Sequence, residues 1–260
     1  MSPEDAGPGC FVAEVVFPGV WIVESDIDDP RRRAGVEGQL MQLASLLDQV
    51  AVTLRFFEVV MVTDRERYKK AQQDEENIRR RVSEQLRLSA ESRREKALSD
   101  TRREAWLGGA EPMSYVHMLP TTFARAFVVA LDRFAKTLAV FAEDVKREAV
   151  TAAKKRLDDG VPGLRDMRDN VAHVEDRGRG VKRGGKPIEL KPVSSSMVRA
   201  PAGGVLVIEG LNGDVFCGTG AKGELVEIPI RRESLCLARD CLQEVLNAFS
   251  WKGGKRYHPT

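Results

Sequence analysis

Histidine and cysteine are scarce in this chain, and their scarcity argues against several kinds of site. The 260 residues include only 3 histidines and 4 cysteines, at Cys10, Cys217, Cys236 and Cys241. None of the cysteines forms a Cys-x-x-Cys pair and no histidine-rich tract accompanies them, so the ligand set of a zinc site is missing. We expect free thiols of a reducing compartment, no bound metal and no other cofactor.

Unbroken apolar runs are also missing. A membrane-spanning helix needs about 20 consecutive apolar residues, whereas the apolar stretch at residues 11–23 is interrupted by Glu14, Pro18 and Gly19. The acidic start of the chain lacks the basic segment that opens a secretory signal peptide. The sequence therefore predicts a cytoplasmic protein with no membrane partner.

The chain carries many charged residues, but positive and negative ones occur in nearly equal numbers. Charged residues make up 31% of the sequence and hydrophobic residues 42%, yet the formal net charge is only +2. Such a composition suits a packed core beneath a charged surface. The net charge itself indicates little about partners.

Two apolar stripes at helical spacing predict two core helices. The first follows a start signal at Asp29-Pro30, and the second follows Thr121 or Thr122 as a cap. Between them, residues 64–104 carry 13 basic and 10 acidic side chains without Pro or Gly, which indicates a long solvated helix or a helical hairpin. The stripes are Leu40, Leu43, Leu47, Val50, Leu54, Phe57 and Met61, and then Phe123, Phe127, Leu131, Phe134, Leu138, Phe141 and Val145.

Beyond residue 158 the periodicity changes from helix to strand. A turn at 158–163 precedes a helix expected at about 164–177. Strands are expected at 205–209, 214–218 and 224–230, with a hairpin at Asn212-Gly213, before a last helix at about 233–249.

We therefore predict a mainly α protein, a four- or five-helix bundle with a small antiparallel β-sheet near the C-terminus. The expected parts are an N-terminal extension with short strands at 1–29 and a helical bundle at 30–178 with a long charged helix at 64–107. A basic flexible loop at 179–202 and a sheet with a C-terminal helix packing on the bundle at 203–260 complete the prediction.

His173 is the histidine with a charged helical context, because His117 lies near a break and His258 in a tail expected to fray. In a continuous helix Asp169 would share a face with His173, four residues later. Arg168 would lie about 140° around the helix from His173. For the two to meet, the side chain must reach around, the helix must be irregular, or a second subunit must contribute.

The segment Arg168-Asp169-Asn170-Val171-Ala172-His173 resembles the Arg-polar-x-x-x-His motif of the HEPN superfamily of helical-bundle proteins. The resemblance covers roughly residues 36–178 in layout and about 17 residues in detail. It implies a HEPN-like fold and a metal-independent endoribonuclease whose site forms between the subunits of a homodimer. A toxin or defence role, with an antitoxin or regulatory protein as a partner, is implied in the same way.

The resemblance also assigns roles that suit the side chains. His173 would act as acid and base on the ribose hydroxyl and the leaving oxygen, and Arg168 would hold the phosphate. Asp169 would orient the imidazole, and Asn170 would bind phosphate or ribose. Five basic residues follow with no acidic residue from 177 to 186, which suits either RNA backbone binding or a solvated linker. They are Arg177, Arg179, Lys182, Arg183 and Lys186.

Other interpretations stay open. A non-catalytic module that binds RNA, nucleotide or protein would use the same bundle, with Arg168 and His173 in salt bridges. A metal site of Asp169, His173 and Asp176 is a poor ligand set, because all three lie on one helix without a second histidine. Glu175 stands where a modified tyrosine occurs in one version of the motif, which argues against that version.

Overall fold

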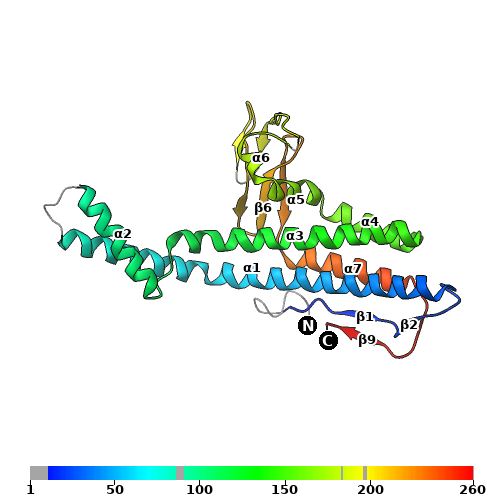
Figure 1. Cartoon of the computed structure of the whole chain (residues 1–260). Coiled ribbons are helices and arrows are strands. Elements are labelled where there is room, and N and C mark those ends of the chain that lie inside the picture. Colours follow the sequence, from blue (N-terminus) through cyan, green and yellow to red (C-terminus); the bar gives the residue numbers. More distant parts are fainter. Residues whose placement is uncertain (1–10, 86–90, 183, 196–197, 260) are drawn as a thin grey trace. The chain divides into compact units, whose positions relative to one another are not determined.

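The computed structural model describes residues 11–85, 91–182, 184–195 and 198–259. Over these residues the protein is mainly helical, with small antiparallel sheets (Figure 1). It divides into two compact units, the first comprising Met1–Phe57 and Phe123–Thr260 and the second Glu58–Thr122. The helices α1 (Pro30–Gln85) and α3 (Met113–Val145) each contribute residues to both units.

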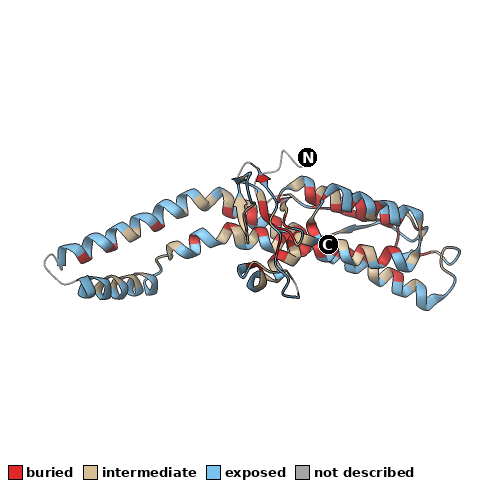
Figure 2. Ribbon diagram, turned by 90° about the horizontal axis from the view of Figure 1, so that it is seen from above, coloured by how far each residue is buried: buried red, intermediate tan, exposed pale blue. Residues whose placement is uncertain are grey.

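The first unit is built on the two predicted apolar stripes. In α1 the stripe residues from Leu40 to Phe57 are buried, and in α3 those from Phe127 to Phe141 are buried. The helices α4 (Glu148–Gly160) and α7 (Arg232–Asn247) pack against each other in the same unit. Figure 2 shows the buried residues gathered along the facing sides of these helices.

The start of α1 is confirmed, and the helix extends into the charged stretch that follows the apolar stripe. Asp29 Oδ1 accepts a hydrogen bond from the Arg31 N–H at 2.9 Å, so Asp29 caps the helix that Pro30 begins. The helix then continues for 56 residues, because helix formers without Gly or Pro fill its charged half. The separate helix α2 (Glu91–Leu107) follows, and its Arg102 pairs with Glu75 of α1. The described parts of 64–107 thus belong to two helices, as in the helical hairpin that was one of the two expected forms.

The predicted start of α3 is also wrong. The Pro112 carbonyl accepts hydrogen bonds from the N–H groups of Tyr115 and Val116, so the helix begins at Met113, and Pro120 lies inside it. Thr122 Oγ1 donates to the Met118 carbonyl instead of capping a helix. A proline removes a single N–H donor, and the neighbouring turns maintain the helix around it.

A three-stranded antiparallel sheet lies near α5 (Leu164–Ala172) in the first unit. Its strands are β5 (Gly210–Asn212), β6 (Val215–Thr219) and β7 (Leu225–Pro229), and the predicted hairpin at Asn212-Gly213 is confirmed. The expected strand at 205–209 is wrong, since the first strand begins at Gly210. There the Thr219 hydroxyl accepts from the Val207 N–H at 2.8 Å, in place of a backbone carbonyl.

The two chain ends pair with each other in the first unit. The strand β1 (Val15–Phe17) pairs with β9 (Arg256–His258), and β2 (Trp21–Ile22) pairs with β8 (Trp251–Lys252). The prediction of a frayed tail is wrong, because His258 Nε2 lies 2.8 Å from Asp48 Oδ2 and its ring meets Phe17 edge-on. A further hairpin of β3 (Val193–Ser194) and β4 (Arg199–Ala200) lies within the expected 179–202 loop.

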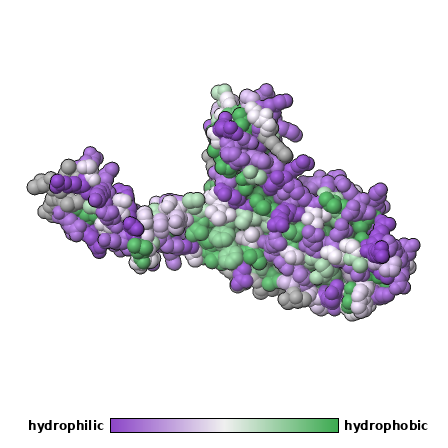
Figure 3. Space-filling model, in the orientation of Figure 1, coloured by the Kyte–Doolittle hydropathy of each residue, from purple (hydrophilic) through white to green (hydrophobic). Residues whose placement is uncertain are grey.

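The surface agrees with the composition. Hydrophilic residues cover most of the face shown in Figure 3. Within the described ranges, each helix is too short or too polar to cross a bilayer. Cys236 and Cys241 carry free thiols, while Cys10 lies outside the described residues.

Candidate functional site

The candidate motif lies at an elbow between two short helices. The helix α5 ends at Ala172 and α6 (Val174–Gly178) begins one residue after His173, which joins them with φ −129° and ψ 44°. The prediction of one continuous helix through 164–177 is therefore wrong at His173. We call residues 164–178 the α5–α6 elbow.

The His173 imidazole is partly exposed to solvent and makes one long ion-pair contact, with Glu175. Its side chain is 30% exposed, and its Nδ1 lies 3.9 Å from Glu175 Oε1. Because His173 is outside the helix, the expected shared face with Asp169 does not apply. Within the described part of the chain, no hydrogen bond or ion pair joins His173 to Arg168 or Asp169.

Arg168 is held by two carboxylates. Its Nε donates to Asp132 Oδ2 at 3.1 Å, and its Nη1 lies 2.8 Å from Asp169 Oδ1. Asp132 is only 4% exposed and also binds Lys136 Nζ at 2.8 Å. Asp132 on α3 and Asp169 in the elbow together fix the position of the guanidinium, and Asp169 binds the arginine instead of the imidazole.

Asn170 faces the interior rather than solvent. Its side chain is fully buried, its Nδ2 donates to the Ile208 carbonyl, and its Oδ1 has no hydrogen-bond partner within the described ranges. A Cβ at Gly218 would come within 2.0 Å of Nδ2. Asn170 therefore ties α5 to the strands beside it and does not reach a bound phosphate in this conformation.

The four basic residues of this set that the structure describes lie in different surroundings. Arg177 is 3% exposed, and its Nε and Nη1 have no hydrogen-bond partner among the residues that the structure describes. Arg179 binds Asp176 at 2.5 Å. The Lys182 N–H donates to the Lys186 carbonyl at 2.9 Å, and Val181 pairs with Pro187; we call the described residues 181, 182 and 184–187 the basic hairpin. Neither lysine has an ion pair with another described residue, and Arg183 lies outside the described residues.

The elbow also brings His173, Glu175 and Asp176 together. One ligand atom from each lies within 4.8 Å of the other two. This differs from the set considered from sequence, because Glu175 replaces Asp169. Arg179 already binds Asp176, and the Glu175 side chain is 71% exposed, so the cluster is explained as solvated ion pairs.

The hydrogen-bond partners of Arg168 and Asn170 could not be identified from the motif alone, because they come from other parts of the chain. The inward position of Asn170 depends on strands that lie far along the sequence, and Asp132 comes from α3. A charged residue within the second apolar stripe was the available signal for Asp132, since such positions are otherwise apolar. No family model, curated protein or solved structure matches this chain.

Proposed function

We propose that this protein binds RNA at the α5–α6 elbow and cleaves it without a metal ion, as a homodimer of the HEPN type. The observation that carries the proposal is the accessible His173 imidazole at the end of α5, which is 30% exposed and, among the described residues, pairs only with Glu175. An imidazole exchanges protons near neutral pH and is the commonest general acid and base. A toxin or defence role would follow only from the same resemblance.

The reaction is a transfer within the RNA backbone. The ribose 2′-oxygen attacks the adjacent phosphorus while His173 takes the hydroxyl proton. The bond from phosphorus to the 5′-oxygen breaks, and that oxygen receives a proton from solvent or from the second His173 of a dimer. The products are a 2′,3′-cyclic phosphate and a 5′-hydroxyl.

One nitrogen of the Arg168 guanidinium remains available to donate a hydrogen bond to a phosphate oxygen. Its Nε faces Asp132 and its Nη1 faces Asp169, so Nη2 is the nitrogen left to donate. Since no bond joins Arg168 to His173 within the described residues, we assign the two groups at one phosphate to different subunits. The basic hairpin would hold the flanking backbone through Lys182 and Lys186.

A second function is favoured by the ion pairs of Arg168. Two carboxylates already offset its charge, one of them buried, so it is a weak phosphate clamp. On this alternative the protein is a non-catalytic module that binds the RNA backbone at the basic hairpin.

RNA incubated in chelator distinguishes the two functions. Wild-type protein should cleave RNA and leave cyclic-phosphate ends, and His173→Ala should lose at least about 100-fold of the rate. The matched control is His117→Ala, which removes an exposed histidine whose ring meets the Tyr68 ring, and it should cleave normally. Equal cleavage by His173→Ala would reveal a contaminant and contradict the proposal.

Binding is measured separately by fluorescence anisotropy of labelled RNA. If RNA is bound but never cut, and Lys182→Glu with Lys186→Glu weakens the complex, the binding module is the function. For the enzyme, mixing inactive Arg168→Gln with inactive His173→Ala should restore activity, because one site of a mixed dimer has both groups. Failure of the mixture to regain activity would contradict a site shared between subunits.

A further inference from the structure

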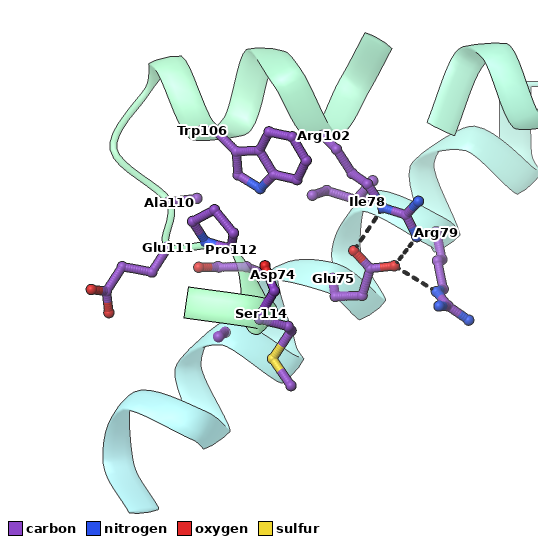
Figure 4. A pocket seen from close by; sticks show the side chains of 12 residues that line it. Asp74, Glu75, Ile78, Arg79, Arg102, Trp106, Ala110, Glu111, Pro112 and Ser114 are labelled. Carbon is purple, nitrogen blue, oxygen red and sulfur yellow. Dashed lines mark hydrogen bonds and ion pairs between the residues drawn. The ribbon is translucent and has the colours of Figure 1, made fainter. Parts of the chain in front are cut away.

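The second unit contains a cavity that the proposed function does not use. It lies between the α1 half of this unit, α2 and the turn before α3, with a volume of about 400 Å³ (Figure 4). Pockets for small molecules begin at about this size. One part of its lining is apolar and includes Trp106, Pro112 and Ile78. The rest carries acidic and basic side chains.

One end of the cavity is electrostatically satisfied. Glu75 accepts hydrogen bonds from Arg102 Nε at 3.0 Å and from Arg79 Nε at 2.8 Å. The bond from Arg102 is the largest cause that lowers the pKa of the Glu75 carboxyl. Glu111, also at the cavity, is paired with Arg67. These carboxylates are therefore neutralised by the protein itself.

Asp74 differs from these carboxylates. It is half-buried in the lining, and within the described residues its side chain has neither a hydrogen bond nor an ion pair. Figure 4 shows it between the Trp106 ring and Ser114, on the apolar side of the cavity. The Trp106 residue beside it remains 46% exposed, although it is the largest apolar group of the lining.

We propose that this cavity binds an organic cation, an ammonium group carried on a short aromatic or aliphatic body. The ammonium would pair with Asp74, the one carboxylate of the described lining without a partner. The body would cover the Trp106 and Pro112 side chains, and an indole face also attracts a cation. This site lies wholly within the second unit and does not depend on RNA cleavage.

A series of ligands that share a phenethyl body and differ in the charged or neutral end group tests the charge requirement. Calorimetric titration of the full chain should show saturable binding of phenethylamine. The neutral 2-phenylethanol should bind roughly tenfold more weakly, since it lacks the ion pair, and the anionic 3-phenylpropanoate should bind more weakly still. Equal binding of the three, tighter binding of the anion, or no heat from phenethylamine would overturn the proposal.

Matched variants locate the site. Asp74→Asn should weaken phenethylamine binding roughly tenfold and leave 2-phenylethanol unchanged. Glu76→Gln, two residues away and outside the lining, should bind both as the wild type does. Trp106→Leu should weaken both ligands. If Asp74→Asn and Glu76→Gln behave alike, binding is a surface charge effect and the proposed site is wrong.

Discussion

Arg168 Nε donates a hydrogen bond to Asp132 Oδ2 over 3.1 Å and so joins the candidate motif to the buried side of α3. Lys136 shares the same carboxylate at 2.8 Å. Two cations thus depend on one aspartate that is 4% exposed. Whatever chemistry Arg168 performs, its side chain also has a structural role.

Replacing the shared carboxylate tests that role. Asp132→Ala should lower the free energy of unfolding by about 3 kcal/mol, because it leaves the part-buried Arg168 without its buried counter-charge. Urea unfolding followed by circular dichroism measures the change. The control is Asp159→Ala, which removes an exposed partner of Lys155 and should cost less than about 0.5 kcal/mol. Equal losses in the two variants would contradict the structural role.

Arg147 fastens the junction of α3 and α4 to the end of α7. Its guanidinium lies 4.3 Å from the Phe249 ring centroid, and its Nη1 donates to the Ala248 carbonyl at 2.5 Å. Arg147→Lys should lower the unfolding free energy by about 1–2 kcal/mol, because an ammonium cannot both stack and donate in this fork. Thermal melting should show Arg133→Lys, at an exposed site, unchanged. An unchanged melting temperature in Arg147→Lys would contradict a stabilising contact between Arg147 and the Phe249 ring.

Gly218 is expected to tolerate no side chain. An added methyl would lie 2.0 Å from Asn170 Nδ2 and 3.1 Å from the Ile208 carbonyl oxygen. Gly218→Ala should therefore cost about 1–3 kcal/mol through overpacking and should also impair the elbow. Gly254→Ala is the matched control, since nothing lies within 4 Å of its added methyl. Urea midpoints of the two variants check the prediction, and a neutral Gly218→Ala would contradict it.

Cys217 makes stability depend on pH in the alkaline range. Burial raises the pKa of its thiol from 9.0 to about 11. The folded state therefore retains a proton that the unfolded state loses, and the free energy of unfolding should fall as the pH rises from 9.0 towards about 11. Unfolding curves across this range should show a flatter decline in Cys217→Ala. An unchanged slope in that variant would assign the decline to other groups.

Local sequence patterns predicted the elements that are determined by residues close together in the sequence. The stripes of α1 and α3, the Asn212-Gly213 hairpin and the last helix all follow from spacing and turn chemistry. The missed features depend on distant partners. The strands β8 and β9 are very short, and they form because β2 and β1, more than 200 residues earlier, supply the pairing.

The candidate site was predictable to the same extent. The charged helical segment after the Pro-Gly turn at 162–163 was visible in the sequence, and it contains Arg168, Asp169 and His173. The burial of Asn170 and Arg177 was not, because each depends on how later segments pack over a short helix. A motif read at helical spacing also assumed a continuous helix, which ends at Ala172.

His258 anchors the C-terminal strand to α1, and removing that anchor gives a local test. Its Nε2 lies 2.8 Å from Asp48 Oδ2, and the His258 side chain is 15% exposed. His258→Ala should lower the opening free energy of β9 by about 1 kcal/mol, because the part-buried hydrogen bond to the Asp48 carboxylate is lost. Hydrogen exchange should then accelerate at Arg256 and in the paired β1, but not at Leu131 in the core of α3. Lys255→Gln, at an exposed neighbour, should leave β9 protection unchanged, and equal exchange in both variants would show that the pair does not hold the strand.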